Sequence, residues 1–198
     1  MTSKTRIKKN EETRAKLIAS ARKAFAEQGF TNASMDVLTA EAGLTRGALY
    51  HNFGDKKGLL AAVIEELDRE MAARAHATVK SRLLLNRWDE LVEEGVAYME
   101  LALDPEIQRI VLLDGPANLG DPSQWPSQNE CLQSTIELLD ELIDNKIVKP
   151  LNTQILARII NGAALNAALW VASHPSPAEA LPLATSAFRE FMIGLKNN

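Results

Sequence analysis

The segment over residues 34–60, SMDVLTAEAGLTRGALYHNFGDKKGLL, constrains the fold of this chain more than any other part of its sequence. It predicts a helix over residues 34–42, a turn, and a second short helix over residues 45–52. Gly43 in the turn supplies the backbone freedom that a sharp reversal needs, and Thr45 can cap the second helix with its hydroxyl. Such a pair of helices is typical of a helix-turn-helix, whose second helix reads the major groove of DNA.

Apolar residues recur at helical spacing along nearly all of the remaining chain. Residues 11–28 predict a first helix that ends at Gly29, and Asp55 is well placed to cap a long helix that runs towards Ala75. Residues 115–127 contain three prolines and two glycines and are predicted to form a loop. Five more helices are expected near residues 81–103, 105–115, 127–147, 151–173 and 177–195.

These elements predict an all-α protein in two parts. Residues 1–54 form an N-terminal three-helix domain that contains the helix-turn-helix, and residues 55–198 form a larger helical body. No segment shows the alternating β-branched pattern of a sheet, and there is no internal repeat.

The net charge of −4 is unequally distributed between these parts. Residues 1–60 contain eleven Lys or Arg and six Asp or Glu, a net charge of +5, which leaves −9 for the rest of the chain. A basic module attracts the phosphates of DNA, and an acidic body faces away from them. A solvated basic face would explain the same excess, so the charge favours DNA binding only together with the helix-turn-helix.

Several other classes of protein are disfavoured by the sequence. The basic N-terminus lacks an apolar signal core and no apolar run reaches the ~18 residues of a membrane span, which favours a cytoplasmic protein. The single cysteine, Cys131, excludes an intrachain disulfide framework and is expected to be a buried or half-buried helical residue. His51, His76 and His174 are scattered and no phosphate-binding glycine loop or nucleophile motif is present, so we expect no enzyme activity, metal or cofactor.

Four segments within about residues 12–60 carry a resemblance to a known family. They are the first-helix segment ETRAKLIASARKAFAEQGF, the turn AGLT, the reading helix RGALYHNF and the start of the next helix, DKKGLL. In order and spacing they resemble the TetR/AcrR family of bacterial transcriptional regulators. The resemblance implies a homodimer whose N-terminal domains bind a palindromic DNA operator and whose C-terminal domains, residues 55–198, dimerise and each bind a small-molecule inducer.

The resemblance also implies which residues contact DNA. They lie at the start of the helix-turn-helix, along its reading helix and at the start of the next helix: Ser34, Met35, Thr45, Arg46, Gly47, Ala48, Tyr50, His51 and Lys56. Arg46 could pair with guanine, a contact that discriminates by roughly 1–3 kcal/mol, and Lys56 matches a lysine that holds a backbone phosphate. Met35 and Asp36 depart from the family pattern, because neither offers a cationic phosphate contact.

Simpler interpretations of some of these residues remain open. Tyr50 could be a partly buried core residue, and His51 a solvated surface residue. Phe53 is assigned to the core, and Lys57 could be a solvated charge.

The apolar helix over residues 155–174 is rich in small side chains, which would let another helix approach closely. This favours a dimer interface, and the resemblance agrees, because the last two helices of such regulators usually pair with their mates. Burial within one chain is the alternative. The candidate interface residues are Gly162, Ala163, Ala167, Trp170, Phe188 and Phe191.

A ligand cavity should have apolar walls with a few polar groups. The candidates are aromatic, flexible or amide side chains on apolar helices, and each could instead be plain core: Trp88, Tyr98, Met99, Leu112, Asn166 and Trp170. The shortage of basic residues in this part of the chain favours a neutral or cationic ligand over a polyanion.

Together these patterns predict a ligand-released repressor, with an activator or an effector-independent DNA-binding protein as alternatives. Two reading helices must lie about 34–36 Å apart to enter successive major grooves. A ligand that prefers a different spacing, acting through the long helix from Asp55, would weaken DNA binding.

Overall fold

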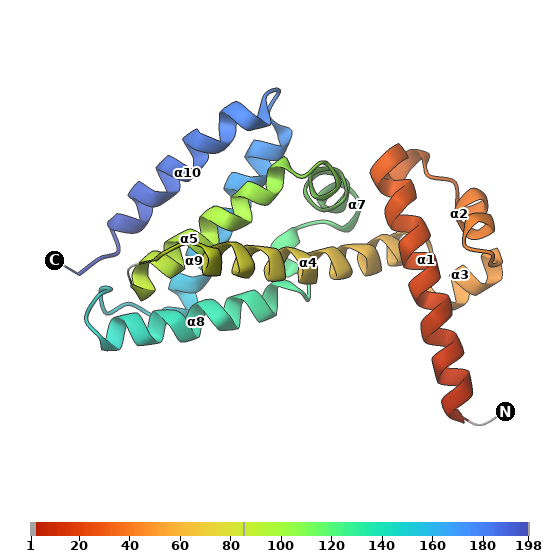
Figure 1. The fold of residues 1–198 in the computed structure, drawn as a ribbon, viewed down its shortest axis with the longest axis horizontal. Helices are drawn as coiled ribbons and strands as arrows, with labels where there is room; N and C mark the ends of the chain where they lie inside the picture. Colours follow the sequence, from red (N-terminus) through yellow and green to blue (C-terminus); the bar gives the residue numbers. More distant parts are fainter. Residues whose placement is uncertain (1–2, 85, 198) are drawn as a thin grey trace.

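A computed structural model describes residues 3–84 and 86–197 of the chain. Within those residues the regular structure is helical, apart from one isolated antiparallel bridge between Val148 and Lys196. Figure 1 shows a small N-terminal module, a long helix that leaves it, and a larger helical body. The predicted all-α fold with two parts is confirmed.

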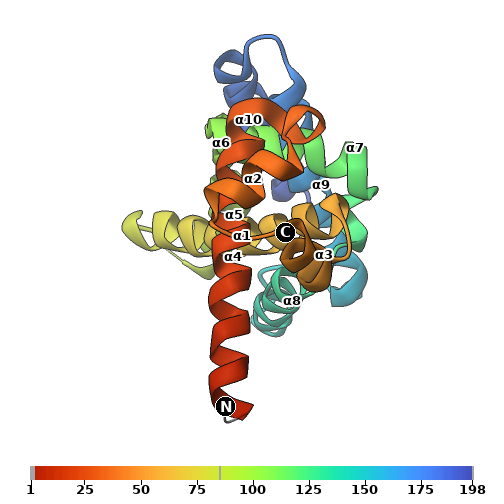
Figure 2. The same ribbon diagram turned by 90° about the vertical axis from the view of Figure 1, so that its right-hand side faces the viewer.

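The N-terminal module contains the predicted helix-turn-helix (Figure 2). Its helices are α1 (Ser3–Asn32), α2 (Met35–Glu41) and α3 (Arg46–Phe53). Gly43 has a φ of 66° in the turn, where a side chain would strain the backbone. Thr45 caps α3, since its hydroxyl accepts a hydrogen bond from the Ala48 amide at 3.2 Å. Leu38 and Leu49 are fully buried between the helices.

The first helix is longer than its apolar pattern predicted. It begins at Ser3 rather than near residue 11, because residues 3–10 contain no glycine or proline to prevent it. Gly29 interrupts it as expected, with φ 76° and ψ 160°, and a short helical stretch continues to Asn32. A Cβ at Gly29 would lie 2.2 Å from the guanidinium of Arg109, so the absence of a side chain lets the body approach the module here.

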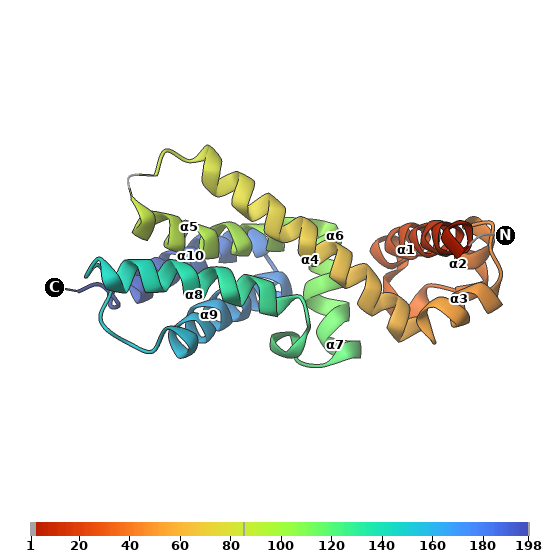
Figure 3. The same cartoon turned by 90° about the horizontal axis from the view of Figure 1, so that it is seen from below.

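The long helix α4 (Lys56–Ser81) starts in the module and ends in the body (Figure 3). The Asp55 carboxylate caps it, accepting a hydrogen bond from the Gly58 amide at 2.7 Å. The helix continues past its expected end near Ala75, since the next residues up to Ser81 contain no helix breaker.

The body contains four longer helices and several short ones. Their bounds are α5 (Arg87–Glu100), a 3₁₀ turn at Leu101–Leu103, α6 (Pro105–Ile107), the π-helix η2 (Gln108–Asp114), α7 (Gly115–Leu119), a 3₁₀ turn at Pro122–Gln124, α8 (Gln128–Asp144), α9 (Thr153–Ser173) and α10 (Pro177–Ile193).

Three predictions about the body were wrong in detail. The helix expected from residue 81 begins at Arg87, where the Asn86 side chain accepts a hydrogen bond from the Asp89 amide. The helix expected over residues 105–115 is divided into α6 and η2. The loop expected over residues 115–127 contains α7, because a proline suits the first turn of a helix.

The helix α9 lies at the centre of the body, packed against α5, α8 and α10. It is long and apolar enough to cross a membrane by composition, with a mean hydropathy of 1.5 over its best window. Leu156, Ile160, Ala164 and Ala168 form its buried face. Packing in the body buries 39% of that window, and the rest of the helix includes exposed apolar side chains such as Ile159 and Trp170.

An ion cluster joins the module to the body. The Arg22 guanidinium on α1 donates to the Glu70 carboxylate on α4 at 2.7 Å and to the Glu106 carboxylate on α6 at 2.7 Å. Nearby, the Phe30 amide donates to the Asp114 carboxylate at 2.7 Å. Elements far apart in sequence are therefore fixed together at the base of the module.

Replacing Arg22 with Met should lower the free energy of unfolding by about 1–2 kcal/mol, because the half-buried Glu106 and the exposed Glu70 would lose their shared donor. Chemical denaturation of the full chain measures this. Arg69→Met is the control, since Arg69 is exposed and donates within α4 to the Glu65 carbonyl. Equal losses in the two variants would contradict a structural role for the cluster.

Candidate DNA-binding and ligand sites

The reading helix α3 presents polar side chains to solvent. Arg46 and His51 are exposed, and Tyr50 has 47% of its surface exposed, so Tyr50 is not a core residue. The Arg46 guanidinium lies 3.3 Å from the Asp36 carboxylate and 3.4 Å from the Tyr50 hydroxyl. Asp36 departs from the family pattern because it is not a cation. In the structure its carboxylate contacts Arg46, the candidate base-reading residue, and so orients that side chain.

The small residues of α3 lie beside these groups. Gly47 is exposed and Ala48 is half-buried, while Thr45 caps the helix and is itself exposed. Residues without large side chains at these positions would let the helix backbone approach a groove closely. The structure therefore brings together Thr45 to His51 of the predicted DNA contacts.

Two further predicted contacts flank α3 at the starts of α2 and α4. Ser34 is exposed and occupies the N-cap position of α2, where its side chain makes no capping bond. Lys56 is half-buried, with its ammonium 4.7 Å from the Phe30 ring and 3.3 Å from the Thr31 carbonyl. Burial lowers the pKa of Lys56. Met35 instead packs half-buried against the core, which leaves it little surface for DNA.

The neighbouring residues Phe53 and Lys57 have different environments. Phe53 is half-buried and packs against the core, with the Arg14 guanidinium 4.7 Å from its ring. Lys57 is exposed. Phe53 therefore belongs to the module's structure, whereas Lys57 stays available to solvent.

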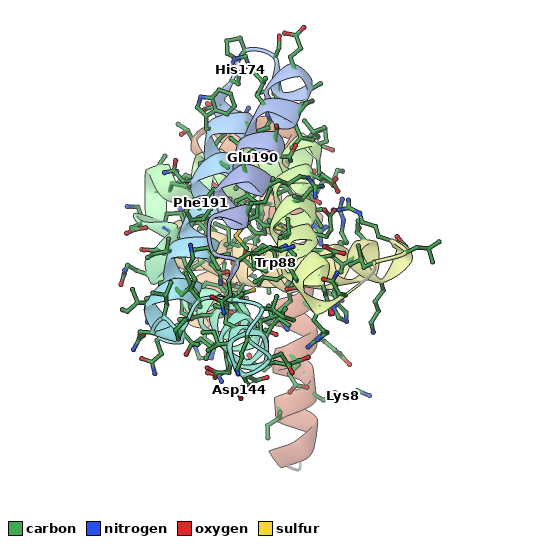
Figure 4. The ribbon with its side chains drawn as sticks, turned by 90° about the vertical axis from the view of Figure 1, so that its left-hand side faces the viewer. Lys8, Trp88, Asp144, His174, Glu190 and Phe191 are labelled. Atoms are coloured by element: carbon green, nitrogen blue, oxygen red, sulfur yellow. The ribbon has the colours of Figure 1, made fainter. Side chains whose placement is uncertain are left out.

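The outer faces of α9 and α10 form an apolar surface with a shallow groove. Figure 4 shows Phe191 on this side of the body. Trp170, Leu183 and Phe191 expose 44%, 65% and 42% of their surfaces. Ala163, Ala167 and Phe188 also line the groove, although Phe188 is 4% exposed and packs mainly inside the body. Gly162 is exposed on α9. An apolar surface of this kind typically marks an interface.

A cavity of about 460 Å³ lies inside the body between α4, α5, α8 and α9. This is the size of pocket that holds a small organic ligand. Apolar and alanine side chains form most of its walls. Its polar lining consists of His76, Glu94, Tyr98, Cys131, Ser134, Thr135 and Asn161.

Tyr98 is the one residue predicted for a ligand site that lines this cavity. Trp88, Met99 and Leu112 are buried in the core, with exposures of 4%, 0% and 3%. Asn166 and Trp170 line the groove on the α9–α10 surface instead. Helical periodicity identified apolar helices but not which face of each turns towards the cavity.

Sequence reasoning missed several cavity residues. Cys131 is exposed at the cavity, which corrects the expectation of a buried or half-buried thiol; it lies on the α8 face that helps to wall the opening. Thr135 and Asn161 join α8 to α9 by a side-chain hydrogen bond of 3.1 Å. One available signal was Glu94, a carboxylate four residues before Tyr98 and so on the same face of one helix.

The electrostatics of the cavity are dominated by acidic groups. Burial raises the pKa of Glu94, and the Glu90 charge raises it further, while Arg87 opposes the shift. Burial also raises the pKa of Asp68, against the effect of a hydrogen bond from the Ser127 hydroxyl. Burial, with Asp68 nearby, raises the pKa of Tyr98. The cavity therefore disfavours negative charge.

Replacing Glu94 with Gln should raise the melting temperature at neutral pH. A carboxyl whose folded-state pKa is raised stabilises the fold when protonated and loses that stability as the pH rises through the folded-state value. The gain should shrink as the pH falls towards 4.5, the ordinary value for this group. Melting curves of the variant and wild type across this range measure it.

Asp140→Asn is the matched control for that experiment, because Asp140 is exposed on α8 and carries the same charge. It should change the melting temperature little at any pH. A Glu94→Gln effect that does not depend on pH would contradict desolvation of the carboxylate as its cause.

Comparisons with known proteins agree with this architecture. Residues 17–63 match the family profile described as bacterial regulatory proteins, tetR family, and residues 88–195 match the profile described as tetracyclin repressor-like, C-terminal domain. The chain is 44% identical to a TetR-family transcriptional regulator from Pectobacterium atrosepticum, with a TM-score of 0.87 to its crystal structure. That match covers 100% of this chain and 99% of the other.

More distant relatives include a named transcriptional repressor. The chain is 34% identical over 102 residues to the HTH-type transcriptional repressor AcnR of Corynebacterium efficiens, covering 52% of each protein. It is 25% identical over 188 residues to the transposon Tn10 TetC protein of Escherichia coli, covering 94% of each. RolR, solved in complex with its ligand resorcinol, shares the fold with a TM-score of 0.73 at 18% identity, over 93% of this chain and 89% of RolR.

The two profiles together extend over most of the chain, from the helix-turn-helix to the last helix of the body. The exposed reading helix α3, its flanking cation Lys56 and the helical body agree with them. The chain belongs to the TetR family of DNA-binding transcriptional regulators.

Proposed function

We propose that this protein is a cytoplasmic repressor that binds a palindromic operator as a homodimer and is released by a small organic effector. The observation that carries the proposal is that α4 serves both sites. Its first residue, Lys56, flanks the reading helix, while Ala72 and His76 near its other end line the cavity. We place the boundary between the DNA-binding and regulatory domains at residues 54 and 55, just before this helix.

Operator binding is assigned to α3 and the residues flanking it. Arg46 is exposed near the start of the helix, where side chains of a helix-turn-helix reach base edges. Lys56 and the Ser34 hydroxyl lie on either side and suit phosphate contacts, which position the protein without reading sequence. The names of relatives such as AcnR support repression as the outcome of binding.

Dimerisation is assigned to the α9–α10 surface. The exposed Trp170, Leu183 and Phe191 would lose their contact with water against the same surface of a second copy. A two-fold interface of this kind places the two modules symmetrically, as a palindromic operator requires.

Effector control follows from the cavity and from α4. A ligand that binds more tightly to a conformation in which the two α3 helices are wrongly spaced, away from about 34–36 Å, would weaken DNA binding through its differential affinity alone. The complex of RolR with resorcinol supports a small organic effector for this fold. A cavity of about 460 Å³ also favours effector control over an effector-independent protein.

Selection of genomic DNA fragments by the purified protein tests the function as a whole. Enrichment of one short inverted repeat, lost in the Tyr50→Ala variant, is the expected result. Tyr50 is exposed and contacts Arg46, so its loss should disturb reading without unfolding the module. Absence of any enriched repeat would contradict operator binding in the effector-free state.

Substitutions in the module should separate base reading from phosphate binding. Arg46→Ala should relax sequence preference, whereas Lys56→Ala should weaken binding to all sequences and reduce the slope of log affinity against log salt by about one. Fluorescence anisotropy with matched and mismatched duplexes measures both. Lys80→Ala, at the far end of α4, is the control. A uniform loss in both module variants would contradict the role of Arg46.

A charge placed on the α9–α10 surface should break the dimer. Leu183→Glu combined with Phe191→Glu should yield monomers in sedimentation velocity runs, because the carboxylates would be buried without partners. Leu83→Glu is the control, since Leu83 is fully exposed in the loop between α4 and α5. Dimers that persist in the double variant would place the interface elsewhere.

A further inference from the structure

The walls of the cavity carry charge of one sign only. Among its lining residues in the described part of the chain, Glu94 is the one carboxylate, and there is no lysine or arginine. His76 is the remaining titratable nitrogen base, on the opposite wall formed by α4. A bound anion would therefore face a carboxylate without a fixed positive charge to balance it.

Glu94 lacks the partners that usually accompany a desolvated carboxylate. Its side chain forms no hydrogen bond or ion pair with any described residue. Arg87 is the cation that acts on it electrostatically, but the Arg87 guanidinium is already bound to Glu90 and, at 2.9 Å, to Glu141. A half-buried carboxylate without a partner costs free energy, which a bound cation would recover.

The surroundings of Glu94 suit the apolar part of such a cation. Tyr98 lies one turn further along α5, and its ring lines the same cavity. Leu91 and Ile160 add apolar surface, and aromatic faces attract organic cations. Asp68, near the Tyr98 hydroxyl, adds negative potential beyond the ring.

We propose that the cavity selects an organic monocation with an aromatic body, with Glu94 as its counter-ion and the Tyr98 ring as a wall. The proposal rests on the effector site assigned above and specifies the chemistry of its ligand. A neutral compound of the same shape would fill the apolar walls but leave Glu94 without a partner. An anion of that shape would be repelled.

Three compounds with one fused-ring frame test this selectivity. They are 9-aminoacridine, which is a cation at neutral pH, acridine, which is neutral, and acridine-9-carboxylate, which is an anion. Calorimetric titration into the full chain without DNA should show the cation binding about tenfold or more tightly than acridine. The anion should bind weakest of the three.

Variants connect the selectivity to Glu94. Glu94→Gln should reduce cation affinity about tenfold and leave acridine affinity nearly unchanged, which removes the preference. Asp140→Asn, with the same change in net charge on the outside of α8, should keep it. Melting curves establish that both variants are folded.

The proposal is overturned if the cation fails to bind, if it binds no better than acridine, or if Asp140→Asn lowers its affinity as much as Glu94→Gln. These outcomes are separate from the proposed function. Release of operator DNA by a neutral compound, without any preference for cations, would contradict the ligand class alone. Tight cation binding that leaves operator affinity unchanged would contradict effector control alone.

Discussion

The structure depends on one continuous helix, α4, that packs against both the N-terminal module and the body. The 26 residues of α4 extend about 39 Å from the base of the reading helix to the wall of the cavity. Every internal turn of a helix is hydrogen-bonded to the next, so the helix moves as one rigid body. A displacement of the cavity end of α4 therefore also displaces its end at the reading helix. Under the proposed function, an effector in the cavity and DNA at α3 would therefore act on the same helix, which is the physical requirement for coupling two sites.

Contacts at the junction between the module and the body hold α4 in place. Arg22 ties α1 to α4 and α6, and the Phe30 amide is fixed to Asp114 at the end of the π-helix η2. The first residue of η2, Gln108, donates to the Ala172 carbonyl near the end of α9. This route joins α9, which carries the proposed dimer surface, to the module without passing through α4. The module is therefore connected to the body in two places, and a shift of one connection relative to the other would rotate the module.

The sequence was sufficient for the module and much less so for the body. In the module, each decisive signal is local: Gly43 turns the chain, and Thr45 and Asp55 cap the helices that follow them. In the body, Pro116 and Gly120 suggested a loop although a proline is compatible with the first turn of α7. The cavity was harder still, since it depends on how four helices are rotated against each other. Tyr98 was identified because it is aromatic. For Glu94 the sequence offered only its spacing of four residues from Tyr98, which places both side chains on one helix face but does not show whether that face meets a cavity or solvent.

On the surface of α3, the side chain of Arg46 is oriented by contacts that are weak enough to be exchanged. Asp36 and Tyr50 position the Arg46 guanidinium at distances of 3.3 and 3.4 Å, and both Arg46 and Asp36 are exposed. Exposed ion pairs contribute little stability, so exchanging these partners for a guanine edge would cost little. Contacts that favour one Arg46 rotamer in the free protein would reduce the entropy lost on binding. If Arg46 reads bases as proposed, Asp36 would offset its own unfavourable charge near the phosphates by orienting that side chain.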